Sequence, residues 1–156
     1  MLFTVDIGNT TVAIAGLEGE RVAFVKKLPS DPGLDWTAAL RQLLEGVKAQ
    51  GAVLSSVVPA LTGPVGEGLK AITGKPVLVV DKTTPTGLDL SGYDTANLGM
   101  DRVVDCVAAL AMYTTPVAVF DMGTATTLSV VDRGGLFRGG MILPGLALGL
   151  EALSAR

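Results

Sequence analysis

The sequence feature that most constrains the fold is a strand-and-turn pattern that occurs twice. A β-prone run at residues 2–7 leads into Asp6-Ile7-Gly8-Asn9-Thr10-Thr11, and a second at residues 117–122 leads into Asp121-Met122-Gly123-Thr124-Ala125-Thr126. In each copy an aspartate leaves the end of an apolar strand, a glycine allows a tight turn, and small polar side chains follow. One such turn is an ordinary hairpin signal, whereas two at the start of similar strand runs indicate a duplicated unit.

The periodicity of apolar residues predicts the other elements. Strands are expected at residues 2–7, 11–17, 21–28, 52–58, 77–80, 117–122, 126–131 and 136–142, and helices at 35–50, 65–72, 99–113 and after 144–145. Residues 81–98 form a polar connection that contains glycine. The order βββαβαβα followed by βββα predicts an α/β fold with a first unit at residues 1–115 and an incomplete second copy at residues 116–156.

Composition excludes several classes of function. The chain has no histidine and one cysteine, Cys106, which excludes Ser-His-Asp and Cys-His triads, a cysteine zinc cluster and an intrachain disulfide. Its net charge is −3 and its twelve Lys and Arg residues are scattered, so we expect no nucleic-acid partner. Neither a membrane-length apolar run nor a signal-peptide pattern is present, which predicts a cytoplasmic protein without a membrane partner.

The repeated turn has a chemical interpretation. Its backbone N–H groups and hydroxyls can bind phosphate oxygens, and the adjacent carboxylate can hold a cation. A third candidate is Asp101-Arg102 at the start of a predicted helix, where a substrate carboxylate would meet N–H groups and a guanidinium. The alternative for this pair is a helix-capping aspartate followed by a surface arginine.

Five short motifs occur in the order seen in type III pantothenate kinases, which the chain resembles over its whole length. They are Asp6-x-Gly-Asn-Thr, Ser55-Ser56-Val57-Val58-Pro59, Gly99-x-Asp101-Arg102, Asp121-x-Gly-Thr-Ala-Thr-Thr127 and Gly139-Gly140-x-Ile142-x-Pro144-Gly145. The resemblance implies ATP-dependent phosphorylation of pantothenate, the first step of coenzyme A biosynthesis. It also implies a pair of ribonuclease-H-like domains of the actin-like ATPase superfamily, a homodimer, and Mg²⁺ together with K⁺ or NH₄⁺ as cofactors.

The resemblance implies roles for individual residues as well. The ATP and phosphate contacts are Asp6, Gly8, Asn9, Thr10, Thr11 and Thr124, with Asp6 also holding Mg²⁺ through ATP. The substrate contacts are Tyr93, Gly99, Met100, Asp101 and Arg102, with Asp101 also the catalytic base. Asp121 matches the ligand of the monovalent cation.

The chain departs from the family pattern in two places. Tyr93 precedes Gly99 by six residues, whereas the family spacing is seven. Family members also continue well past the segment that matches Pro144-Gly145. We therefore expect a truncated chain, part of a longer chain, or a natural fragment completed by a partner.

Other functions remain open at this point. Gly66-Glu67-Gly68-Leu69-Lys70-Ala71 fits a dinucleotide-binding pattern, although it follows Pro64 and not a strand, and Asp81 comes too soon after it. Another kinase or phosphatase of the same superfamily, with a different small-molecule acceptor, is a second alternative. The third is a non-catalytic nucleotide- or ligand-binding or regulatory protein that keeps the fold.

Overall fold

The computed structural model describes residues 1–155 and confirms the predicted order of elements. The strands are β1 (Leu2–Ile7), β2 (Thr11–Glu18), β3 (Arg21–Pro29), β4 (Ala52–Ser56), β5 (Val77–Val79), β6 (Val117–Met122), β7 (Ala125–Val131) and β8 (Phe137–Pro144). The helices are α1 (Trp36–Leu43), α2 (Pro59–Thr73), α3 (Met100–Met112) and α4 (Leu146–Ser154). The chain divides into two compact units, Met1–Thr83 and Thr84–Arg156.

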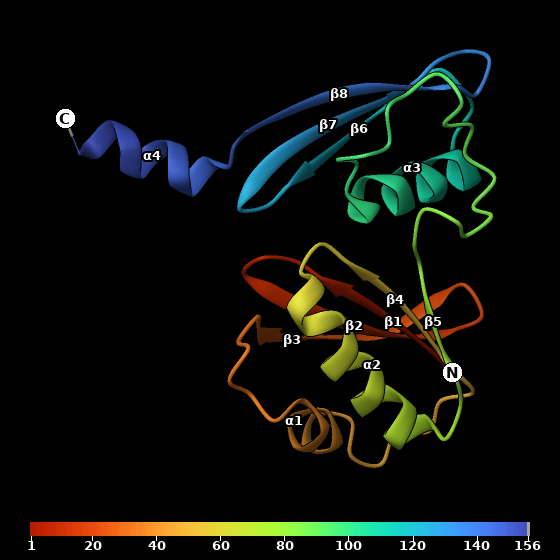
Figure 1. The fold of residues 1–156 in the computed structure, drawn as a ribbon, viewed down its shortest axis with the longest axis vertical. Helices are drawn as coiled ribbons and strands as arrows, with labels where there is room; N and C mark the ends of the chain where they lie inside the picture. The colour runs from red at the N-terminus through yellow and green to blue at the C-terminus, as the bar shows by residue number, and fades with distance from the viewer. Residues whose placement is uncertain (156) are drawn as a thin grey trace. The chain divides into compact units, whose positions relative to one another are not determined.

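The first unit is a five-stranded sheet with α1 and α2 on one face (Figure 1). The strand order is β3-β2-β1-β4-β5, and β1 is antiparallel to β2 but parallel to β4. Alternate side chains of β1 point to the helices, because successive residues of a strand face opposite sides. The core between this sheet and the two helices contains Phe3, Val5, Ile7, Val12, Ile14, Trp36, Leu40, Leu54, Leu61, Val65 and Leu69, all of them buried.

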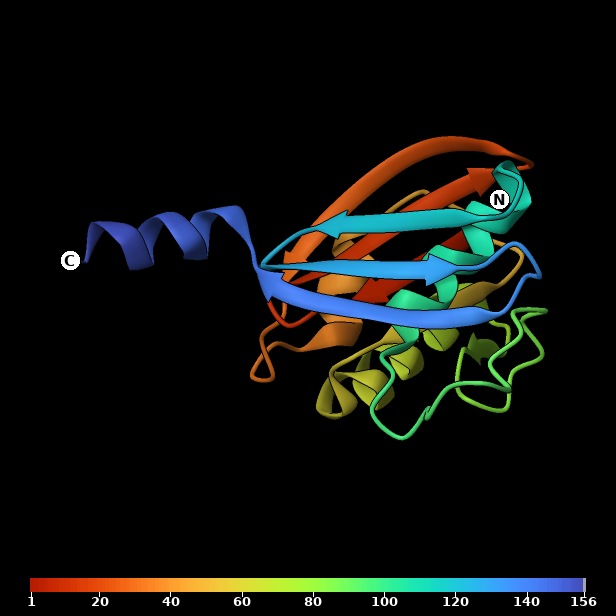
Figure 2. The same ribbon diagram turned by 90° about the horizontal axis from the view of Figure 1, so that it is seen from above.

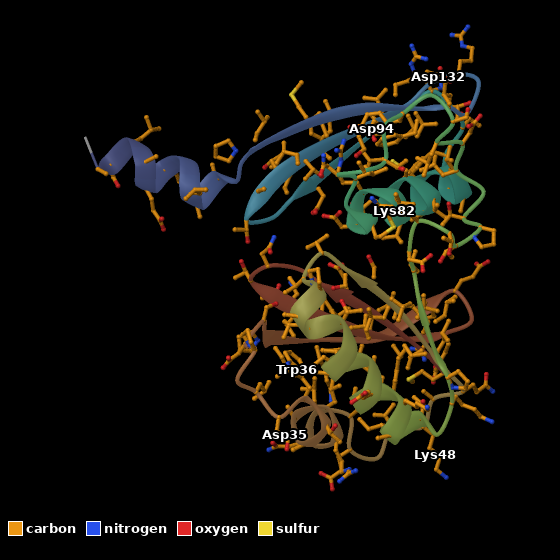
Figure 3. All side chains as sticks on the ribbon, viewed as in Figure 1. Asp35, Trp36, Lys48, Lys82, Asp94 and Asp132 are labelled. Atoms are coloured by element: carbon orange, nitrogen blue, oxygen red, sulfur yellow. The ribbon has the colours of Figure 1, made fainter. Side chains whose placement is uncertain are left out.

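Two helix boundaries in this unit differ from the sequence prediction. Asp35 caps α1 by accepting the Ala38 N–H at 3.0 Å, as predicted, and Trp36 follows it (Figure 3). The helix ends at Leu43 and not at residue 50, and the chain then turns at Gly46 with φ 74°. Helix α2 begins at Pro59, six residues earlier than predicted, because proline suits the first turn of a helix.

The second unit is a three-stranded antiparallel sheet, β6-β7-β8, with α3 against one face (Figure 1). The buried side chains between them are Leu88, Leu98, Met100, Val103, Cys106, Val131 and Phe137. The boundary between the two compact units lies before α3, because this helix packs on β6 and β7 of the second unit. The predicted division at 115/116 follows the repeat instead, and it stays a prediction.

The connection before α3 is ordered by aspartate side chains. Asp89 accepts the Ser91 N–H and Asp94 accepts the Ala96 N–H, each at 2.9 Å. The carbonyl of Asp89 also accepts the Phe137 N–H at 2.9 Å, which ties the connection to β8. Asp132 organises the turn between β7 and β8 in the same way, through the N–H groups of Gly134 and Leu136 (Figure 3).

Helix α4 extends from the end of β8 (Figure 2) and has no buried residue. Its exposed apolar side chains are Leu146, Leu148, Leu150 and Leu153. None of the helices within residues 1–155 combines the length and the apolar character that crossing a membrane requires.

Candidate active site

The first candidate phosphate loop is the turn between β1 and β2, and hydrogen bonds from Ser30 support it. The Gly8 N–H donates to the Thr11 carbonyl at 3.0 Å. The Ser30 N–H donates to the Thr10 carbonyl at 3.0 Å, and the Ser30 hydroxyl donates to the Gly8 carbonyl at 2.6 Å. The side chains of Asp6, Asn9, Thr10 and Thr11 are exposed, so the loop has a fixed backbone and accessible polar groups.

The end of β4 lies beside this loop and leads directly into α2. The Val57 N–H donates to the Ile7 carbonyl at 3.0 Å, which joins the two strand ends. The Ser56 hydroxyl accepts the Val58 N–H at 3.1 Å and the Thr62 hydroxyl at 2.9 Å, which fixes the first turn of α2. Ligands of α/β folds bind at the carboxyl ends of parallel strands, and the positive end of a helix dipole attracts phosphate.

Ser55 gives a structural test of whether Mg²⁺ fits this edge. It is 6% exposed, and its hydroxyl has no hydrogen-bond partner within residues 1–155. Ser55 pairs with Asp6 in the parallel register of β1 and β4, so both residues belong to the same face of the sheet. Nucleotide-bound Mg²⁺ takes one or two protein carboxylates and keeps several waters. One carboxylate beside a hydroxyl that lacks a partner fits such an ion.

The second loop, between β6 and β7, is held by backbone hydrogen bonds equivalent to those of the first. The Gly123 N–H donates to the Ala125 carbonyl at 3.0 Å, and the Gly145 N–H donates to the Thr124 carbonyl at 3.1 Å. In both copies the supporting N–H belongs to the residue after a proline that ends the third strand, Pro29 or Pro144. Sequence reasoning missed these supports, although the repeated Leu-Pro-Ser and Leu-Pro-Gly segments were a signal for them.

Gly145 differs from Ser30 in how closely its backbone approaches the loop. A Cβ atom at this position would lie 2.2 Å from the Gly123 carbonyl oxygen and 2.4 Å from that of Thr124. Only glycine fits there. Two carbonyl oxygens therefore converge near Gly145, in the same turn as the exposed side chains of Asp121 and Thr124.

The structure groups no acidic cluster around either loop. Within residues 1–155, no three Asp, Glu or Cys side chains are placed to hold one metal ion. A cation at Asp6 or Asp121 would therefore depend on neutral protein oxygens and on ligand phosphates, which are the donors that hard cations accept. The hydroxyl and carbonyl oxygens of the two turns are of this type.

The start of α3 places the predicted catalytic residue. Gly99 is the N-cap and Met100 the first helical residue, so Asp101 stands second in the helix and is not the cap. Asp101 is half-buried, and its Oδ1 accepts the Arg102 N–H at 2.8 Å. The amino end of α3 thus presents a carboxylate that is partly accessible.

Arg102 is buried, which rules out the alternative of a surface arginine. It is 7% exposed, its Nε donates to the Ser129 hydroxyl at 3.0 Å, and its Nη2 donates to the Leu128 carbonyl at 2.9 Å. Its guanidinium carbon lies 5.6 Å from the centre of the Phe137 ring. Sequence reasoning did not find Ser129, whose only signal was a hydroxyl residue on the inward face of an alternating strand.

Tyr93 belongs to the same cluster in the second unit. Its ring packs edge-on against Phe137, with centroids 5.0 Å apart and planes at 88°. Gly139 has φ 88°, and a Cβ there would lie 2.6 Å from the Tyr93 ring. The absence of a side chain at Gly139 therefore leaves room for the Tyr93 ring, and its absence at Gly140 leaves room for the Arg102 guanidinium. A contact between Tyr93 and substrate stays a prediction.

Cys106 lies beside this cluster and is chemically protected. It is fully buried, and burial raises the pKa of its thiol, while the Ser129 hydroxyl acts in the opposite direction. A thiol reacts as its thiolate, so this cysteine is expected to be inert.

The sequence profile of the type III pantothenate kinases matches residues 2–156. The chain belongs to this family. It is 40% identical to the type III pantothenate kinase of Rhodospirillum centenum over 98% of the chain, and 37% identical to that of Rubrobacter xylanophilus over all of it. The chain spans about 62% of the length of each of these two relatives.

Solved structures show the fold. The chain matches the ethanolamine utilization protein EutJ of Carboxydothermus hydrogenoformans with a TM-score of 0.53 and 19% identity, over 98% of this chain and 56% of that one. It matches a Ppx/GppA phosphatase of Aquifex aeolicus with a TM-score of 0.50 and 19% identity, over 97% of this chain and 54% of that one. The predicted actin-like ATPase fold is confirmed. The dinucleotide alternative is wrong, because Gly66 and Gly68 lie inside α2 and not between a strand and a helix.

Proposed function

We propose that the whole protein transfers the γ-phosphoryl group of ATP to the primary hydroxyl of pantothenate, the first step of coenzyme A biosynthesis, in the cytoplasm. The observation that carries this proposal is the family match across residues 2–156. The geometry of each unit agrees with it, since one unit has a hydrogen-bonded turn with exposed polar side chains and the other a carboxylate and an arginine at a helix start.

In this proposal the first loop and the amino end of α2 bind the ATP phosphates. The backbone N–H groups and hydroxyls of residues 8–11 meet phosphate oxygens, and Ser30 keeps the loop in shape. Asp6 and Ser55 would hold Mg²⁺ through its water shell. When bound, Mg²⁺ neutralises charge on the β- and γ-phosphates.

Asp101 acts as the base toward the acceptor. As the pantothenate oxygen forms its bond to the γ-phosphorus and the bond from phosphorus to ADP breaks, the hydroxyl proton passes to the Asp101 carboxylate. Protonated Asp101 then releases this proton to solvent. Gly99, Met100 and Tyr93 line the acceptor, and the N–H donors of Arg102 that lie outside its two internal bonds receive the pantothenate carboxylate.

The second loop and the oligomer complete the proposal. Asp121, Thr124 and the carbonyl oxygens near Gly145 bind K⁺ or NH₄⁺, which suits the neutral oxygens gathered there. A homodimer is proposed as well, supported by the exposed apolar side chains of β6, β8 and α4.

An acceptor panel tests the function. The whole protein is incubated with ATP, Mg²⁺ and K⁺, and ADP release is measured with pantothenate, a sugar or acetate. We expect turnover with pantothenate alone and 4'-phosphopantothenate as product. Turnover of the sugar or acetate without turnover of pantothenate would assign the protein to another kinase of the superfamily, and ATP binding without any turnover would favour the regulatory alternative.

A further inference from the structure

We propose that Ser129 is a positioning residue for the acceptor: together with the Leu128 carbonyl it orients the Arg102 guanidinium so that its remaining N–H donors receive the substrate carboxylate. This inference rests on the proposed function. It concerns a residue of β7 that lies 27 positions from Arg102 in the chain.

Hydrogen bonds to two neighbours hold the Arg102 guanidinium. An arginine side chain has five N–H donors in one plane. Ser129 takes the donor on Nε at 3.0 Å and Leu128 takes one on Nη2 at 2.9 Å. Two bonds from different nitrogens of a planar group fix both its position and its rotation. Three donors lie outside these two bonds.

The charge of the Arg102 guanidinium favours an anionic ligand. Arg102 is 7% exposed, and both acceptors just named are neutral. A buried cation is stabilised most by an anion with matching geometry, and a carboxylate accepts two parallel N–H bonds from a guanidinium. An anionic ligand at the remaining donors would therefore interact strongly with Arg102.

Close packing around the guanidinium makes this arrangement specific. The guanidinium lies over the Phe137 ring, and Ser129 is 2% exposed. A Cβ atom at Gly140 would lie 1.8 Å from the Leu128 carbonyl oxygen and 2.9 Å from Nη2 of Arg102. Strand β8 therefore approaches the bonded group as closely as glycine allows, and the guanidinium has one orientation.

The test compares three variants of the whole protein. Ser129→Ala removes the acceptor of the Nε–H, and Ser129→Thr keeps a hydroxyl. Val131→Ala removes packing from a fully buried side chain on the same face of the same strand, so it controls for lost stability. For each we measure the dissociation constant of pantothenate by calorimetry, KM and kcat for both substrates, and the hydrogen-exchange rate of the Arg102 Nε–H by NMR.

We expect Ser129→Ala to raise the dissociation constant and the KM of pantothenate about tenfold, the size of one charge-assisted hydrogen bond. The KM of ATP and kcat at saturating pantothenate stay within about twofold, and exchange of the Arg102 Nε–H becomes faster. Ser129→Thr restores slow exchange and tight binding. Val131→Ala lowers the melting temperature but leaves pantothenate binding unchanged.

The proposal is overturned if Ser129→Ala binds pantothenate as tightly as the wild type, or if Val131→Ala weakens binding as much as Ser129→Ala does. It is also overturned if the wild-type protein does not bind pantothenate. The proposed function fails separately, when pantothenate binds to the wild type but is not phosphorylated.

Discussion

At the scale of single residues, the proposed mechanism depends most on Asp101. Replacing it with asparagine keeps size and polarity but removes the proton acceptor. We expect Asp101→Asn to lower kcat by about 10²- to 10⁴-fold, the range for loss of a general base. Steady-state kinetics of the whole protein measure this effect, and circular dichroism checks the fold.

Glu67→Gln is the matched control for that experiment. It removes one carboxylate from an exposed position of α2, so it should retain wild-type turnover. A correctly folded Asp101→Asn protein with wild-type kcat would remove Asp101 from the mechanism.

Cys106 gives a second prediction at this scale. Because burial raises the pKa of its thiol, the folded chain keeps a proton that the unfolded chain loses above about pH 8.5. The contribution of this thiol to the free energy of unfolding is therefore complete at neutral pH. It falls as pH rises through that region, by at most about 1.4 kcal/mol per pH unit.

Urea unfolding at pH 7.5 and 9.5 measures this effect. Cys106→Ala should be less stable than the wild type at pH 7.5, because a buried side chain is shortened. Its stability should depend less on pH, because the thiol is gone. An equal loss of stability between the two pH values in both proteins would show that the thiol does not titrate differently in the folded state.

At the scale of elements, the approach of β8 to β7 depends on a glycine. A Cβ at Gly140 would overlap the Leu128 carbonyl, so Gly140→Ala must push the two strands apart. We expect a loss of about 2–4 kcal/mol in the free energy of unfolding, the range for severe single substitutions. Chemical denaturation of the whole protein measures it.

Gly66→Ala is the control with the opposite sign. This glycine lies within α2, and nothing is within 4 Å of the Cβ that alanine would add. Alanine is the better helix former, so stability should rise by about 0.5–1 kcal/mol. If Gly140→Ala raised the free energy of unfolding as Gly66→Ala does, the close contact between β7 and β8 would not exist in solution.

The turn between β6 and β7 carries the prediction on cations. If Asp121 and the carbonyls near Gly145 bind a monovalent ion, the whole protein should need K⁺ or NH₄⁺ and lose activity in Na⁺ alone. Asp121→Ala should remove that dependence and most of the rate. Activity is measured against K⁺ and Na⁺ at saturating Mg²⁺. Identical curves for the two ions would leave Asp121 to a divalent ion or to the structure of the turn.

At the scale of the whole molecule, the order of elements could be predicted from the sequence because it follows from local periodicity. The alternation of Phe3, Val5 and Ile7 identifies a strand with one buried face, whatever surrounds it. The end of α1 could not be predicted in the same way. The apolar pattern continues to Val47, but the helix ends at Leu43 and the chain turns at Gly46, where φ is 74°.

The candidate sites were predictable only as far as their motifs are contiguous. The two loops and the start of α3 are short local patterns. The partners that hold them are distant in sequence: Ser30 lies 22 residues from Gly8, and Ser129 lies 27 from Arg102. The repeated segments around Pro29 and Pro144 mark the position of Ser30, whereas Ser129 is one of several hydroxyl residues on β7 and has no such mark.

The support of the two loops has a consequence for which substitutions each copy tolerates. In both copies the supporting bond comes from a backbone N–H, at Ser30 and at Gly145. Every amino acid except proline supplies that group, so selection on the bond alone leaves the side chain free to vary. In a saturation-mutagenesis library, position 30 should exclude proline and should favour residues with a hydroxyl, because the Ser30 hydroxyl adds a bond to the Gly8 carbonyl, whereas position 145 should accept only glycine, because two carbonyl oxygens occupy the space of any side chain. The two copies therefore differ at this corner: the first has room for a side chain, and the second does not.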